Sequence, residues 1–99
     1  MPKVKLESKI QTEIIQYLQG RTCKSVTYKH PPYPTGIPDI IHYEKGRVYN
    51  FEVKRTINDK ARAMQKYRIK KLKRAGIVAV VVRSVNDVKK IMKKGYTLS

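Results

Sequence analysis

The feature that most restricts the fold is an uninterrupted apolar run at residues 77–82. Five of its six side chains are β-branched, which favours a strand. A run with no polar alternation suits a buried strand in a sheet that is covered on both faces. It is far shorter than the roughly 20 apolar residues needed to cross a bilayer. We therefore expect a buried strand inside a soluble domain.

The first half of the chain shows one helical pattern followed by β patterns. Residues 6–19 place an apolar side chain at every fourth position, which is typical of an amphipathic helix. These side chains are Leu6, Ile10, Ile14 and Leu18. A short β-rich segment at 25–28 precedes a proline-rich loop at 30–36. Residues 39–43 and 48–54 then form the pattern of a hairpin, so we expect three strands after the first helix.

The second half places a helix on each side of the apolar run. Residues 58–75 form a long helical pattern that stops at Gly76. Ser84 and Asp87 are three residues apart and can form a capping box for a last helix. The predicted order is helix, three strands, helix, strand, helix. This is an α/β fold in one domain over residues 1–99, because so short a chain cannot supply two independent cores.

Charge is the strongest compositional signal. The chain has 23 Lys and Arg against 7 Asp and Glu, a net charge of +16. Such a surface attracts polyanions, and nucleic acid is the simplest partner. The alternative is a basic surface that serves solubility alone. A membrane partner is disfavoured, because no aromatic insertion face flanks the basic stretches and the N-terminus has no signal-peptide core.

The single cysteine, Cys23, excludes an intramolecular disulfide framework and a zinc site built from several cysteines. We predict that it is a small core residue. Together with the absence of a signal-peptide core, this indicates an intracellular protein.

The few acids are more informative than the many bases. Alternation along 48–54 puts Glu52 and Lys54 on one face of a strand. Asp39 begins the partner strand, so the hairpin would bring its carboxylate close to Glu52. Two converging carboxylates repel each other unless a cation lies between them, and their oxygens suit Mg²⁺. The backbone carbonyl of Val53 would add a further ligand.

This arrangement suggests phosphodiester hydrolysis. A bound Mg²⁺ acidifies water and neutralises charge on a scissile phosphate, while the ammonium of Lys54 orients the attacking water. The alternative interpretation is structural: Asp39 caps a turn after Pro38, and Glu52 and Lys54 form a solvated pair. The chain would then be a non-catalytic, basic nucleic-acid-binding module.

The segments Gly36-Ile37-Pro38-Asp39 and Glu52-Val53-Lys54 resemble the signature of the PD-(D/E)XK nuclease superfamily. More narrowly, the chain resembles the VRR-NUC family, the virus-type replication and repair nucleases. Further matches are Glu7 with Ile10-Gln11 on the first helix and Gln65 on the second. The resemblance extends from Glu7 to Val82.

The resemblance implies a restriction-endonuclease-like αβββαβα core, with a central mixed sheet flanked by helices. It also implies hydrolysis dependent on Mg²⁺, for which Mn²⁺ would substitute. Glu7 would support the metal site, although Glu13 on the other flank of the same helix is an alternative. Gln65 would assist water or substrate. Its position in an apolar stripe between Ala61 and Ile69 agrees with this, but also with a buried amide bonded to backbone.

The resemblance further implies the partner and the assembly. Stand-alone virus-type members are similar to Holliday-junction resolvases and act as homodimers. We therefore expect a homodimer that cuts branched DNA such as a four-way junction, in a viral or phage setting and in the host cytoplasm. A restriction-type enzyme that reads a short sequence is less well supported, because little chain remains for a recognition element.

Two basic segments are expected to hold the DNA. The helix after the Glu-x-Lys strand contains no acid between Lys60 and Arg74, and its cations would contact phosphates without reading bases. The candidates there are Lys60, Arg62, Lys66, Arg68, Lys70 and Lys73. The loop before Asp39 adds Lys29, His30 and Tyr33, whose ring would stack on an unpaired base. A solvated charged face is the alternative for the helix.

Overall fold

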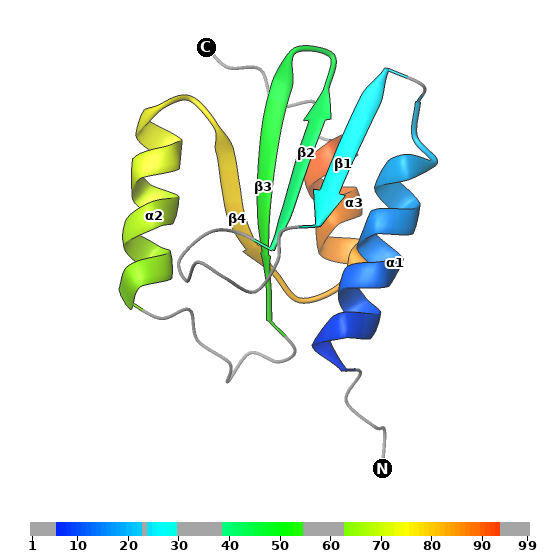
Figure 1. Cartoon of the computed structure of the whole chain (residues 1–99), viewed down its shortest axis with the longest axis horizontal. Helices are drawn as coiled ribbons and strands as arrows, with labels where there is room; N and C mark the ends of the chain where they lie inside the picture. Colours follow the sequence, from blue (N-terminus) through cyan, green and yellow to red (C-terminus); the bar gives the residue numbers. More distant parts are fainter. Residues whose placement is uncertain (1–5, 23, 30–38, 55–62, 94–99) are drawn as a thin grey trace.

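The computed structural model describes residues 6–22, 24–29, 39–54 and 63–93. Three helices and four strands follow in the predicted order (Figure 1). They are α1 (Glu7–Gln19), β1 (Ser25–Lys29), β2 (Ile40–Glu44), β3 (Arg47–Val53), α2 (Ala63–Arg74), β4 (Val78–Val82) and α3 (Val85–Lys93). The predicted α/β class is confirmed. The second helix was predicted to start at residue 58, and the part of this prediction that covers residues 58–62 lies outside the described residues.

The four strands form one mixed sheet in the order β1-β2-β3-β4. The first three strands are antiparallel neighbours, and β4 pairs with β3 in parallel. The β2–β3 hairpin turns at Lys45 and Gly46, whose φ angles are 51° and 79°. Positive φ at both central residues of a two-residue loop matches the twist of paired strands, and glycine adopts it without strain.

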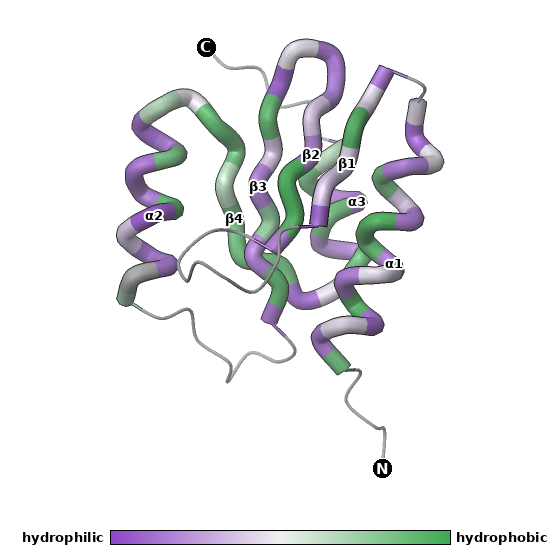
Figure 2. The backbone as a smooth tube through the Cα atoms, viewed as in Figure 1, coloured by the Kyte–Doolittle hydropathy of each residue, from purple (hydrophilic) through white to green (hydrophobic). Residues whose placement is uncertain are grey.

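The core lies between one face of the sheet and the helices α1 and α3 (Figure 1). Phe51, at the centre of β3, is fully buried there together with Ile14 and Leu18 of α1. Figure 2 shows hydrophobic residues on the sides of α1 and α3 that face the sheet. The prediction for Leu6 is wrong. This residue is 66% exposed because it precedes the first helical residue and does not face the core.

Strand β4 is less covered than its sequence predicts. Val78, Ala79 and Val82 are buried, but Val80 and Val81 are only half-buried. The physical reason is that β4 is the last strand of the described sheet and α2 covers it from one side only (Figure 1). The expectation of a strand fully covered on both faces is therefore wrong for these two residues.

Helix α3 is capped as the sequence predicts. The backbone N–H of Asp87 donates to Ser84 Oγ over 3.3 Å. The carboxylate of Asp87 reaches back to the backbone N–H of Arg83 at 2.8 Å, one residue before the position in a standard capping box. Among the described helices, none is long and apolar enough to cross a membrane.

Candidate active site

The hairpin places Asp39 beside the end of β3. Ile40 pairs with Phe51 in the antiparallel register, so one step further along each strand brings Asp39 opposite Glu52. The side chain of Asp39 is fixed there, because its Oδ2 accepts a hydrogen bond of 2.8 Å from the backbone N–H of Val53. Asp39 is thereby anchored to the strand that carries Glu52.

Glu52 lies at the centre of this cluster and is only 3% exposed. Its Oε1 accepts a hydrogen bond of 2.5 Å from Nε2 of Gln65 on α2. Nζ of Lys54 lies 3.7 Å from the same oxygen. Glu52 and Lys54 therefore share one face of the chain at the end of β3, as strand alternation predicts, and α2 contributes a third polar group to the same point.

The electrostatics at Glu52 reflect burial first and neighbouring negative charge second. Burial, together with the nearby carboxylates of Asp39 and Glu7, raises the pKa of this carboxyl group to about 7. Lys54 acts in the opposite direction but offsets only part of the effect. Glu7 thus acts on the pKa of Glu52, whereas Glu13 is not among the groups that do so. This favours Glu7 among the two candidates on α1.

The donor set fits a hard divalent cation. Asp39 and Glu52 offer carboxylate oxygens, and a cation between them would offset both the burial of Glu52 and its repulsion by Asp39. Within the described residues, no three Asp, Glu, His or Cys side chains form a complete metal-ligand group. Two carboxylates suffice for Mg²⁺, which keeps several waters and takes its other ligands from substrate phosphate. The carbonyl of Val53 stays a predicted ligand.

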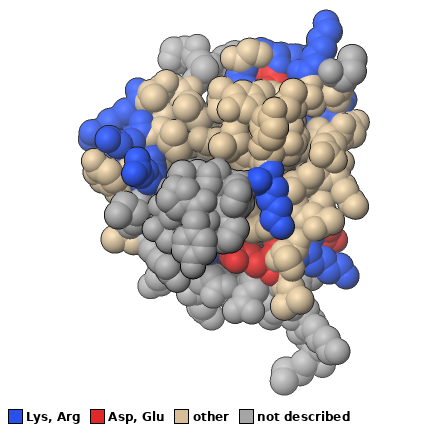
Figure 3. Space-filling view, viewed as in Figure 1, with Lys and Arg blue, Asp and Glu red and all other residues tan. Residues whose placement is uncertain are grey.

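Exposed basic side chains lie on α2, the helix that contributes Gln65 to this cluster. On the face shown in Figure 3, acidic atoms appear in its lower half with a basic side chain directly above them, and further basic side chains gather over α2. The candidates Lys66, Arg68, Lys70 and Lys73 lie on α2 and are exposed, and Lys29 is exposed at the end of β1. The candidates His30, Tyr33, Lys60 and Arg62 lie outside the described residues, as does Cys23.

His42 lies on the core side of the sheet and takes no part in the cluster. It is fully buried, with one ring nitrogen 2.7 Å from Thr27 Oγ1 and the other 3.0 Å from a carboxylate oxygen of Glu44. Glu44 also accepts two hydrogen bonds of 2.9 Å from the guanidinium of Arg21. Each of these polar groups is satisfied by the others, so the network ties α1 to β1 and β2.

Asn50 is a residue of the site face whose environment could not be read from the sequence. It is 5% exposed, and its Oδ1 is a buried atom without a hydrogen-bond partner. Strand alternation places Asn50 two residues before Glu52 on the same face. That alternation was a usable signal for its direction. Its burial depends on how closely the sheet is covered, which no local pattern contains.

The arrangement of helices and sheet has counterparts among solved structures. One, named "VRR_NUC domain", superimposes with a TM-score of 0.76 and 22% sequence identity, covering 91% of this chain and 97% of its own. This chain has the VRR-NUC fold. A second structure, named "VRR_NUC domain protein", also gives a TM-score of 0.76 at 22% identity, covering 94% of this chain and 89% of its own.

The VRR-NUC fold is detected through structure and not through sequence. A scan against models of known families finds no match, and a search of curated proteins finds none. At 22% identity, the similarity shows a shared fold. The predicted mixed sheet with flanking helices is thereby confirmed in its topology, and the chemistry depends on the residues of the cluster itself.

Proposed function

We propose that this chain is a metal-dependent nuclease of the PD-(D/E)XK type that hydrolyses phosphodiester bonds in DNA. The observation that carries the proposal is the meeting of Asp39, Glu52 and Lys54 at one point of a VRR-NUC fold. A buried carboxyl group with a strongly raised pKa beside a second carboxylate is typical of a functional site. The names of the two similar structures support the same class of activity.

The proposed division of labour follows from the contacts. Asp39 and Glu52 would hold Mg²⁺, or Mn²⁺ in its place, with Glu7 adding negative charge and Val53 a backbone oxygen. When bound, a divalent ion supplies Lewis-acid chemistry, lowering the pKa of water and neutralising charge on the phosphate. Lys54, with its ammonium 3.7 Å from Glu52, would orient the attacking water and offset negative charge on the phosphate oxygens. Gln65 holds the Glu52 carboxylate in a fixed orientation.

The preferred substrate in this proposal is branched DNA, and the active assembly is a homodimer. Two active sites on a twofold axis match the approximate symmetry of a four-way junction. Light scattering on the purified protein tests the assembly: a mass of one chain at the concentrations used for cutting would contradict it.

The charge of +16 favours a second candidate, a basic module that binds nucleic acid without cutting it. One experiment separates the two. Purified protein is incubated with an end-labelled four-way junction, a flap and a plain duplex, each with Mg²⁺ or with chelator. The nuclease proposal predicts cut products only with Mg²⁺, and more of them from branched DNA. Retarded but intact DNA under all conditions would support the binding module.

A further inference from the structure

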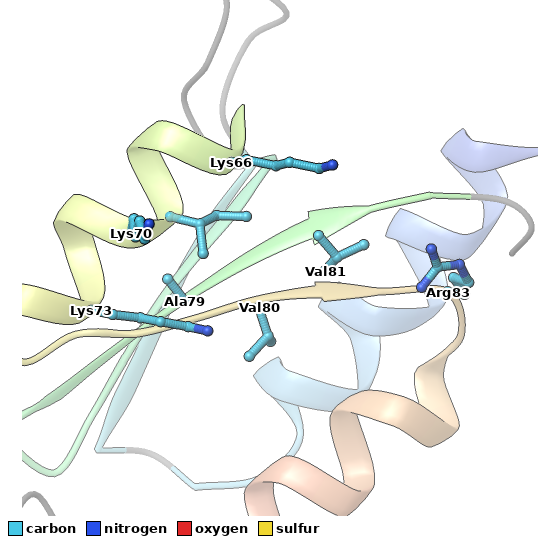
Figure 4. A pocket seen from close by; sticks show the side chains of 8 residues that line it. Lys66, Lys70, Lys73, Ala79, Val80, Val81 and Arg83 are labelled. Atoms are coloured by element: carbon cyan, nitrogen blue, oxygen red, sulfur yellow. The ribbon is translucent and has the colours of Figure 1, made fainter. Parts of the chain in front are cut away.

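A groove lies between α2 and the half-buried outer strand β4. It has a volume of about 710 Å³, within the range of ligand-binding pockets. Its cationic lining consists of Lys66, Lys70, Lys73 and Arg83. In Figure 4, Lys66 and Lys73 extend from α2 toward β4, and Arg83 lies at the end of the strand. The groove therefore has positive charge along its length.

The floor of the groove is apolar. Ile69 of α2 and Ala79, Val80 and Val81 of β4 line it between the charged side chains. Figure 4 shows Ala79 and Val81 on one side of the strand and Val80 on the other, so the groove follows the edge of the sheet. This explains why Val80 and Val81 are only half-buried although their sequence predicts full burial.

Among the described residues, the lysines of the groove have no carboxylate partners. The described ion pairs join Glu44 to Arg21 and His42, and Glu52 to Lys54, and none includes Lys66, Lys70 or Lys73. Side chains spaced along one helix face without acids between them repel each other unless an anion neutralises them. A polyanion would supply that charge, whereas a second copy of this chain, with its net charge of +16, would add to the repulsion.

We infer that this groove binds a single strand of DNA that leaves the active site. The groove lysines fit the backbone phosphates, and the apolar floor fits sugars and unpaired bases, which a duplex would keep stacked inside its helix. From Ala79 to Arg83 the strand rises about 13 Å, or roughly four times the distance of about 3.4 Å between phosphates along one strand of B-form DNA. The identity of the polyanion as DNA rests on the proposed function.

The groove begins next to the catalytic cluster. Val81 is the register partner of Glu52, and Lys66 follows Gln65, whose amide contacts the Glu52 carboxylate. A strand in the groove would therefore lead directly away from the cleavage point. This arrangement gives a physical basis for selecting DNA with an unpaired segment beside the cut.

The test measures binding in the presence of chelator, so that no cutting occurs. The variant Lys70→Gln with Lys73→Gln removes two groove charges. The matched control, Lys71→Gln with Arg74→Gln, removes two charges from the same helix outside the groove. Fluorescence anisotropy follows a labelled oligothymidylate, an abasic strand of the same length and a duplex, over a range of salt concentrations.

We expect the groove variant to bind oligothymidylate about tenfold more weakly at low salt. The slope of the logarithm of the binding constant against the logarithm of the salt concentration should be less steep by about 1.4, or about 0.7 for each lost charge. The control should change affinity less than about twofold, and the parent should bind the abasic strand more weakly than oligothymidylate. Equal losses in both variants would overturn the inference. So would equal binding of the abasic strand, or duplex binding that is as tight and as sensitive to the groove charges.

This result is independent of catalysis. If the parent binds as expected but cuts nothing with Mg²⁺, the proposed nuclease function fails and the groove assignment stands. If it cuts branched DNA but the groove variant binds normally, the groove assignment alone fails.

Discussion

Two properties of Glu52 disfavour its charged form in the metal-free protein. It is almost completely buried, and it lies beside Asp39 and near Glu7 in a chain that has few acids. Burial and repulsion both disfavour its charged form, which explains why its pKa rises to about 7. A folded protein tolerates such a group when function requires it.

This property predicts a stability change in the metal-free protein. The pKa of Glu52 is about 4.5 in the unfolded chain and about 7 in the folded one, so the folded state binds more protons between these values. Its contribution to stability is full below pH 4.5 and is lost as pH rises to 7. Above pH 7 in chelator, Glu52→Gln should therefore have a free energy of unfolding higher than that of the parent by on the order of 2 kcal/mol. It should unfold at a higher temperature.

Thermal denaturation at several pH values provides the measurement, with Glu13→Gln as the matched control on α1. Added Mn²⁺ should raise the melting temperature of the parent and leave Glu52→Gln unchanged. A Glu52→Gln protein that is less stable than the parent at pH 8 in chelator would contradict this explanation.

For Glu44 we predict the opposite dependence of stability on pH. The guanidinium of Arg21, helped by His42, lowers the pKa of this carboxyl group to about 2 against the opposing effect of burial. Because the folded pKa lies below the unfolded value of 4.5, the stabilisation is present above pH 4.5 and is lost as pH falls toward 2. Glu44→Gln should cost about 2 kcal/mol at pH 7, and less at pH 3.

Urea denaturation at both pH values checks this prediction. An equal loss of stability at pH 7 and pH 3 would show that packing, and not the ion pair, explains the effect of the substitution.

At the scale of elements, α2 connects the cluster of Asp39, Glu52 and Lys54 to the basic groove. Gln65, on its first described turn, contacts Glu52, and the cations that follow line the groove. Gln65→Leu should keep the helix and its packing, since leucine is a good helix former of similar size. It should reduce the cutting rate about 10- to 100-fold, because the carboxylate it orients becomes mobile.

The cutting rate at saturating DNA is the measurement for Gln65→Leu. Rescue by Gln65→Asn is not expected, because the shorter amide does not reach Oε1 of Glu52. Unchanged cutting by Gln65→Leu would show that Gln65 has only a packing role.

The boundaries and types of the elements follow closely from local patterns. Hydrophobic period, the Lys-Gly turn and the Ser84 cap are encoded within a few residues, and each agrees with the structure. The exposure of Leu6 and the half-burial of Val80 could not be predicted in this way. Both depend on where an element lies in the assembled sheet, which local sequence does not specify.

At the scale of the whole molecule, alternation and hairpin geometry were enough to place Asp39 near Glu52 and Glu52 beside Lys54. The resemblance assigned Gln65 to the site, but its hydrogen bond to Glu52 was not predicted, since that bond joins separate elements. The role of Arg83 in the groove had no sequence signal, because it depends on α2 lying across the edge of β4. The net charge predicted a polyanion partner but not the place on the surface where it binds.

The central claim is that Asp39, Glu52 and Lys54 form a catalytic centre and do not merely stabilise the hairpin. Asp39→Asn tests it most directly, because the amide oxygen can still accept the hydrogen bond from Val53 while the negative charge is lost. The cleavage rate of a labelled four-way junction with Mg²⁺ is compared with junction binding in chelator. We expect cutting to fall at least about 100-fold with binding within about twofold of the parent. An Asp39→Asn protein that cuts as fast as the parent would contradict the claim.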